Sequence, residues 1–63
     1  MNEEDREVLR AMRIYGGGFV SALAEAGYRA DEENLRRIKE AWPEYWSQYL
    51  KMSQRAQGEH KPT

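Results

Sequence analysis

The chain has 63 residues with no cysteine and one histidine, which excludes a disulfide framework and a zinc site built from cysteine and histidine. Ten basic and eleven acidic residues give a net charge of -1, which argues against the strongly basic surface of nucleic-acid binders. No apolar run approaches the ~20 residues that span a bilayer, and the acidic start of the chain is unlike a secretion signal. We therefore expect a cytoplasmic protein.

Helical periodicity begins close to the start of the chain. The first predicted helix covers Glu3–Tyr15, where Val8, Met12 and Tyr15 recur at helical spacing and form an apolar stripe. Acidic residues occupy its first turn, where the positive end of the helix dipole favours them. Three consecutive glycines, Gly16–Gly18, follow and predict a turn.

The second predicted helix covers Gly18–Gly27. Its buried face is expected to consist of residues at helical spacing, namely Phe19, Leu23, Ala26 and Ala30. The small residues on this helix would let another helix approach closely. Gly27 is expected to end the helix in the left-handed conformation that glycine adopts easily.

The third helical region begins at Asp31, a favoured N-cap residue. Its apolar positions are spaced 3 and 4 apart and form one seam, made of Leu35, Ile38, Trp42, Tyr45, Tyr49 and Met52. Opposite charges four residues apart, Glu33 with Arg37 and Arg36 with Glu40, support the outer surface. Pro43 predicts either a sharp kink or a break with a new helix beginning at the proline, and we favour the packing of both halves on the earlier helices.

These elements predict an all-α fold, a small three- to four-helix bundle. A single helical domain is expected over residues 1–56, with a disordered tail over residues 57–63. A domain of this size buries only ~60 % of the surface that its unfolded chain exposes. Association with a partner or as a homodimer would therefore add stability.

Catalysis, cofactors and metal ions are not expected in this chain. Acid–base chemistry needs a pocket with positioned groups of shifted pKa, and so small a helical domain can hardly enclose one. His60 falls in the predicted tail, and the acidic residues that follow Asp31 are accounted for as a helix start. The glycine run resembles a phosphate loop but lacks the Gly-Lys-Ser/Thr that such a loop needs, so a turn is favoured.

The stretch AWPEYWSQYL places four large rings within eight positions. We expect Trp42 and Tyr45 to lie in the core, because they share the phase of the preceding helix. Beyond the proline, Trp46 and Tyr49 are expected to be exposed anchors for a protein partner, with Tyr45 helping, since Trp and Tyr are enriched in interface hot spots. The predicted polar rim of this interface consists of Arg37, Glu40 and Glu44.

A different class of function remains open through the basic residues. A nucleic-acid-binding regulator would use the positive side chains on the predicted first and third helices, which are Arg6, Arg10, Arg13, Arg36, Arg37 and Lys39. The acidic residues that lead the third helix argue against this alternative, because they would repel a duplex. A structural or assembly protein is a further alternative.

Three stretches of the sequence form a recurring pattern: Gly16-Gly17 with Phe19 to Ala26, then Ala30-Asp31 with Asn34, then Pro43 to Trp46. In this pattern, which covers about half of the chain, the sequence resembles a group of small proteins encoded by bacteriophages and prophages. The chain departs from the pattern where Trp42 replaces a phenylalanine and where Gly18 occupies a position that is often polar. The resemblance gives no residue a role. It implies a phage accessory protein that binds a larger protein of its bacterial host and blocks or redirects it.

Overall fold

The computed structural model describes the backbone of residues 1–60 and the side chains of residues 1–55. Four helices make up this part of the chain: α1 (Glu3–Tyr15), α2 (Gly18–Arg29), α3 (Glu32–Ala41) and α4 (Pro43–His60). No strand occurs among the described residues, so the fold is all-α as predicted. The prediction of a disordered tail concerned residues 57–63. Residues 57–60 belong to the last turn of α4, where only the backbone is described, and residues 61–63 lie outside the described residues.

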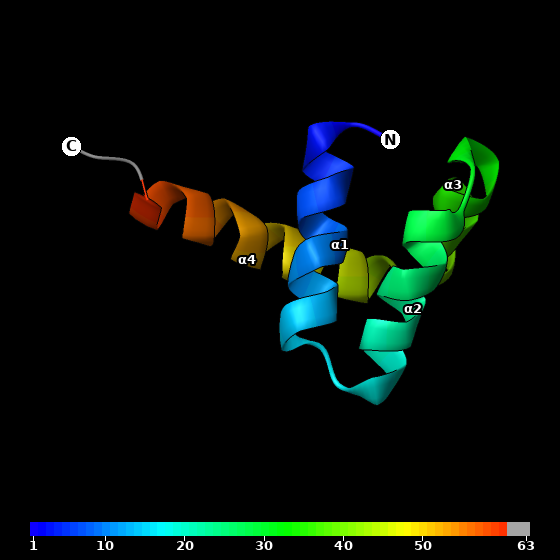
Figure 1. Ribbon diagram of the computed structural model, residues 1–63, viewed down its shortest axis with the longest axis horizontal. Coiled ribbons are helices and arrows are strands. Elements are labelled where there is room, and N and C mark those ends of the chain that lie inside the picture. The colour runs from blue at the N-terminus through cyan, green and yellow to red at the C-terminus, as the bar shows by residue number, and fades with distance from the viewer. Residues whose placement is uncertain (61–63) are drawn as a thin grey trace.

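The helices are arranged as an antiparallel pair crossed by a long helix. α1 and α2 run side by side and are joined by the short glycine turn, while α4 crosses α1 at a steep angle (Figure 1). α3 connects the far end of α2 to the start of α4 and packs on both of them. α1 therefore lies between two neighbours, α2 and α4.

Local capping explains where the helices begin. The side chain of Asn2 accepts a hydrogen bond from the backbone N–H of Asp5 at 2.7 Å, and Asp31 accepts one from Asn34 at 2.8 Å. Both are N-caps that satisfy a backbone donor at the helix start, and the one at Asp31 was predicted from the sequence. α2 has no such side-chain cap, because Gly17 occupies its N-cap position.

Pro43 separates α3 from α4, which is one of the two arrangements that the sequence left open. α3 ends at Ala41, and Trp42 takes a non-helical conformation with φ -132° and ψ 63°. Proline disfavours the helical conformation for the residue before it and fits the first position of a helix, because its missing N–H would have no partner there. The chain therefore turns at Trp42, and α4 runs in a different direction from α3.

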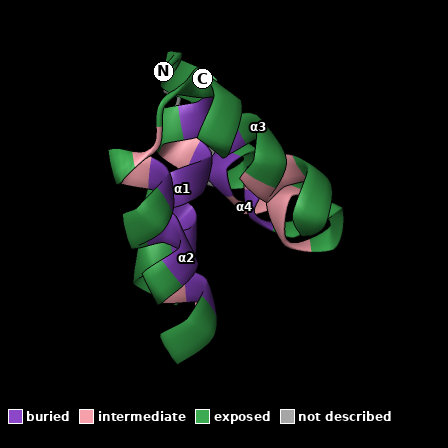
Figure 2. Ribbon diagram, turned by 90° about the vertical axis from the view of Figure 1, so that its right-hand side faces the viewer, coloured by how far each residue is buried: buried purple, intermediate pink, exposed green. Residues whose placement is uncertain are grey.

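The hydrophobic core is centred on α1. Its largest fully buried side chains are Leu9, Met12 and Val8. The rest of the buried core comes from the other helices and one alanine of α1, namely Ala11, Val20, Leu23, Ala24, Leu35 and Tyr49. In Figure 2 the buried residues face one another where α1 meets α2 and α4, and the outer surfaces of α2 and α3 are exposed.

The predicted buried faces need two corrections. Tyr15 ends the predicted stripe of α1 but is 63 % exposed. On α2 only Leu23 of the expected set is buried, while Phe19 and Ala26 are exposed. The face that meets α1 contains Val20 and Ala24 instead. The close approach of α1 and α2 requires small side chains on this face of α2.

Gly27 is also not the helix end that the sequence predicted. α2 continues to Arg29, and no glycine among the described residues has a positive φ. Gly27 is buried against Leu9, where a Cβ atom would lie 2.5 Å from a methyl carbon of that leucine. The glycine is thus explained by the contact between α1 and α2.

Candidate functional site

The aromatic rings of the AWPEYWSQYL stretch are divided between core and surface in a different way from the prediction. Tyr49 is only 6 % exposed and belongs to the core, so it is not a surface anchor. Trp42, which was expected in the core, is 38 % exposed, and Tyr45 and Trp46 are half-buried. The reason is the break at Pro43: α4 starts with a new direction and phase, which turns Tyr49 toward α1 and leaves Trp42 at a corner of the fold.

The half-buried ring of Trp46 contacts a lysine side chain of the same chain. The ammonium nitrogen of Lys39 lies 4.9 Å from the centre of its ring, within the range of a cation–π interaction. The same ammonium forms an ion pair with Asp5 at 2.8 Å, and the side chain of Asp5 is only 9 % exposed. Lys39 therefore connects α3 to both α1 and α4, and Trp46 supports this connection.

Three rings from different segments meet at the surface. Phe19, at the start of α2, lies 5.7 Å from Trp42 and 6.1 Å from Tyr45 between ring centres. The interplanar angle of 67° for the first pair is an edge-to-face contact, a favourable arrangement for aromatic rings. Phe19 is 55 % exposed, so these contacts hold its ring in place and still leave half of it in water. We call Phe19, Trp42 and Tyr45 the aromatic corner.

A shallow groove continues from the aromatic corner between α2 and α3. Eight residues line it: Ala26, Arg29, Ala30, Asn34, Arg37, Ile38, Ala41 and Trp42. Trp42 belongs to both features, so they form one surface. The lining combines small or apolar side chains with two guanidinium groups, and it contains no carboxylate. We call the aromatic corner and this groove together the α2–α3 surface.

The predicted polar rim is spread over different faces. Arg37 borders the groove and forms an ion pair with Glu33 at 3.6 Å. Glu40 binds Arg36 at 2.7 Å, and Arg36 also binds Glu33. Hydrogen bonding to Glu33, and then to Glu40, raises the pKa of Arg36 above its ordinary value.

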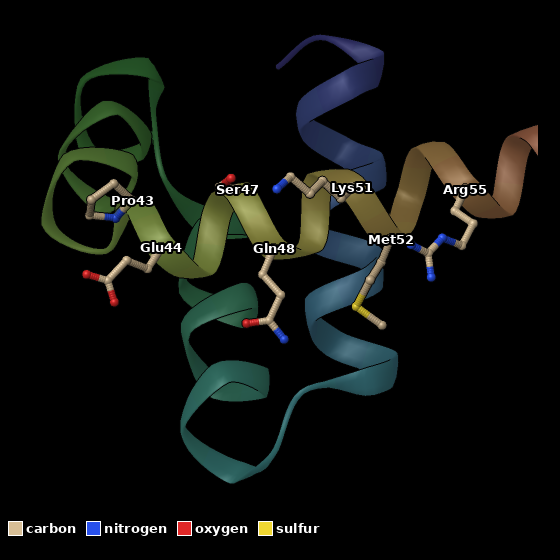
Figure 3. A pocket seen from close by; sticks show the side chains of 7 residues that line it. All are labelled: Pro43, Glu44, Ser47, Gln48, Lys51, Met52 and Arg55. Carbon is tan, nitrogen blue, oxygen red and sulfur yellow. The ribbon is translucent and has the colours of Figure 1, made fainter.

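Glu44, the third predicted rim residue, lies on the outer face of α4. It is one of seven residues around a shallow hollow, the others being Pro43, Ser47, Gln48, Lys51, Met52 and Arg55. All of them come from one helix, and Figure 3 shows Glu44 and Arg55 toward opposite ends of the row. This face is a solvated side of α4, separate from the α2–α3 surface.

The basic residues of the alternative function lie on two different helices, α1 and α3. Arg6 and Arg10 are exposed on α1, where Arg13 pairs with Glu25 at 3.8 Å. The three basic residues of α3 all have carboxylate partners, as described above, and Lys39 is turned toward Asp5. Of the six basic residues, four are thus balanced by an acidic neighbour.

Sequence reasoning assigned only two members of this surface, Tyr45 and Arg37, to an interface. Phe19 and Ala26 were assigned to the core, and Arg29 was not considered. One signal was present in the sequence: Val20, Ala24 and Gly27 form an alternative stripe of small and branched residues at helical spacing. Burying that stripe turns the Phe19 side outward.

Comparison with known proteins adds no assignment. No protein-family profile, curated protein or solved structure matches this chain. The described residues contain no group of three or more histidine, aspartate or glutamate side chains placed to hold a metal ion. Within the same part of the chain, no helix is both long enough and apolar enough to cross a membrane.

Proposed function

We propose that the protein acts by binding another protein through the α2–α3 surface, and that it thereby covers and blocks a surface of a larger partner. One observation carries the proposal. Phe19 and Trp42 are in edge-to-face contact with each other, yet they remain 55 % and 38 % exposed beside a groove lined mainly by small and apolar side chains. Aromatic rings that are fixed before binding lose little conformational entropy when a partner covers them.

The composition of the groove supports a helical segment of the partner as the ligand. Ala26, Ala30 and Ala41 keep the groove shallow and smooth, so an amphipathic helix can lie against it. The arginines at its border provide hydrogen-bond donors for the polar side of such a segment. The resemblance to phage accessory proteins suggests which kind of partner is bound, namely a larger protein of the host whose surface is covered.

The proposal is tested by single substitutions in the surface. Phe19→Ser removes an exposed ring, and Ala26→Glu places a charge in the groove; both positions are exposed, so the fold should persist. Capture of a specific partner from a lysate of the native host should fall about thirtyfold or more with each variant, the loss expected for an interface hot spot. Quantitative mass spectrometry of the captured proteins measures it.

Tyr15→Ser is the matched control, because Tyr15 is 63 % exposed and lies outside the α2–α3 surface. This variant should capture the partner as the native protein does, and far-ultraviolet circular dichroism should show equal helix content for all variants. Partner capture that survives both Phe19→Ser and Ala26→Glu in folded protein would rule out this surface as the binding site.

A further inference from the structure

The outward row of α2 has a symmetric spacing. Its residues are Phe19, Ala22, Ala26 and Arg29, at intervals of 3, 4 and 3, and all four are exposed. Two copies of this helix placed antiparallel, with the centre at position 24, bring Ala22 of one copy to Ala26 of the other. The same register brings Phe19 of each copy to Arg29 of the other. The row is therefore complementary to itself in the antiparallel direction.

We propose that the α2–α3 surface binds a second copy of this chain, with the two α2 helices antiparallel. This inference rests on the proposed function, because it names an occupant for the same surface. In the resulting dimer α2 of each copy lies along the groove between α2 and α3 of the other. The contact is a symmetric four-helix arrangement.

The alanines determine how close the two helices come. Helix axes are 8–10 Å apart in typical packings, and the value depends on the side chains at the contact. Ala22 and Ala26 at the centre permit an approach at about the short end of that range. Such an approach brings the larger side chains at both ends of α2 into reach of the other copy.

The charges fit the antiparallel direction. Arg29 has no carboxylate partner among residues 1–55, and the groove beside it has no carboxylate in its lining. In the dimer its guanidinium meets Phe19 and Trp42 of the second copy, and cations bind favourably over aromatic faces. Because the dimer is symmetric, this contact between Arg29 and the rings of the other copy occurs twice.

Repulsion between the two Arg29 side chains is small in this geometry. The two Arg29 side chains are ten residues apart along the paired helices, about 15 Å at the rise of an α-helix. That distance exceeds the Debye length of about 8 Å at physiological ionic strength. Glu25 lies nearer the centre, but on the flank of the helix, where Arg13 of its own chain pairs with it at 3.8 Å.

The dimer also affects the proposed binding of a larger partner. Because the second copy covers the same surface, the partner competes with dimerisation. Capture per molecule should therefore be strongest at concentrations at which the protein is monomeric.

The first measurement is the mass of the protein in solution by sedimentation equilibrium. We expect a monomer–dimer equilibrium for the native chain. Ala26→Glu should raise the dissociation constant by about thirtyfold or more, since the larger side chain at the alanine contact would hold the two helices apart. Phe19→Ser should act in the same direction, and Tyr15→Ser should leave the constant unchanged.

The second measurement fixes the orientation by disulfide formation, for which the absence of native cysteine is an advantage. The variants Ala22→Cys and Ala26→Cys are prepared separately, one of them labelled with a heavy isotope, and mixed under oxidising conditions. A disulfide needs Cα atoms less than about 7 Å apart. The antiparallel register predicts that mass spectrometry finds mainly the mixed product of one heavy and one light chain.

The outcomes separate the dimer from the proposed function. A monomer at all concentrations, combined with loss of partner capture in Phe19→Ser, overturns the dimer and leaves the function standing. A dimer that is insensitive to Ala26→Glu, or cross-links in which each variant prefers itself, overturns the proposed surface or its orientation. If the dimer forms as expected but no variant affects partner capture, the inference holds for self-association and the proposed occlusion fails.

Discussion

Gly16 and Gly27 occupy positions where neighbouring atoms leave no room for a side chain. Neither has a positive φ, so their backbone conformations are open to any residue. A Cβ atom on Gly16 would collide with the carbonyl oxygen of Met12 and lie 2.5 Å from a methyl carbon of Val20. The turn between α1 and α2 is therefore packed tightly on its first glycine, while Gly18 has open space around it.

This difference predicts opposite effects for two neighbouring substitutions. Gly16→Ala should lower the free energy of unfolding by about 1–3 kcal/mol, because the backbone carbonyl cannot yield as a side chain would. Gly18→Ala should be neutral or stabilising by up to about 1 kcal/mol, because it replaces glycine within a helix without a contact. Urea denaturation of the two variants measures both values. Equal effects would show that the turn is not packed as described.

Single positions were predictable where the cause is local. Asp31 was identified as an N-cap because its side chain bonds to the backbone three residues later, a relation within one helix start. Gly27 was misassigned because its cause is Leu9, which lies on a different helix. Glycine at a helix end and glycine at a helix crossing look the same in the sequence.

At the scale of the elements, α3 is the helix with the fewest buried side chains. Leu35 is its one buried residue within the described chain. The ion pair between Lys39 and Asp5 adds a connection to α1, across 34 positions of sequence. Since Asp5 is largely removed from water, this pair is screened less than a surface pair.

A double-mutant cycle with Asp5→Asn and Lys39→Gln should therefore give a coupling energy of about 1–2 kcal/mol, above the range of exposed pairs. The control is the exposed pair of Arg36 and Glu40 on the same helix, with Arg36→Gln and Glu40→Gln. Its coupling should be below about 0.5 kcal/mol. Thermal unfolding of both sets gives the energies, and similar couplings for the two pairs would contradict a structural role of Lys39.

The helices themselves were predictable, whereas the faces that they bury were predicted only in part. Asp31 and Pro43 mark the bounds of α3 and α4 in the sequence by their own chemistry. The buried side of α2 depends on the direction from which α1 approaches, and both sides of α2 carry apolar residues at helical spacing. Periodicity alone cannot choose between them, so Phe19 was placed inside and Val20 was left out of the predicted face.

At the scale of the whole molecule, the aromatic rings are divided between the core and the surface. Tyr49 closes the core beneath α1, and Phe19 and Trp42 stand at the exposed edge of the α2–α3 surface. The sequence interpretation had the reverse order for Trp42 and Tyr49, because it followed the apolar seam only as far as Pro43 and expected the proline to turn the later rings outward. The direction of α4 after Pro43 is set by packing on α1, which places Tyr49 in the core and leaves Trp42 partly exposed.

The direct test of this division compares the free energies of unfolding of Tyr49→Ala and Phe19→Ala in urea. Tyr49→Ala should lose about 3–5 kcal/mol, as for other buried aromatic residues, and this is most of the stability that a domain of this size has. Phe19→Ala should lose about 1 kcal/mol and keep a cooperative transition, because half of its ring is already in water. If Phe19→Ala proves the more destabilising change, the ring belongs to the core, and the α2–α3 surface loses its central residue.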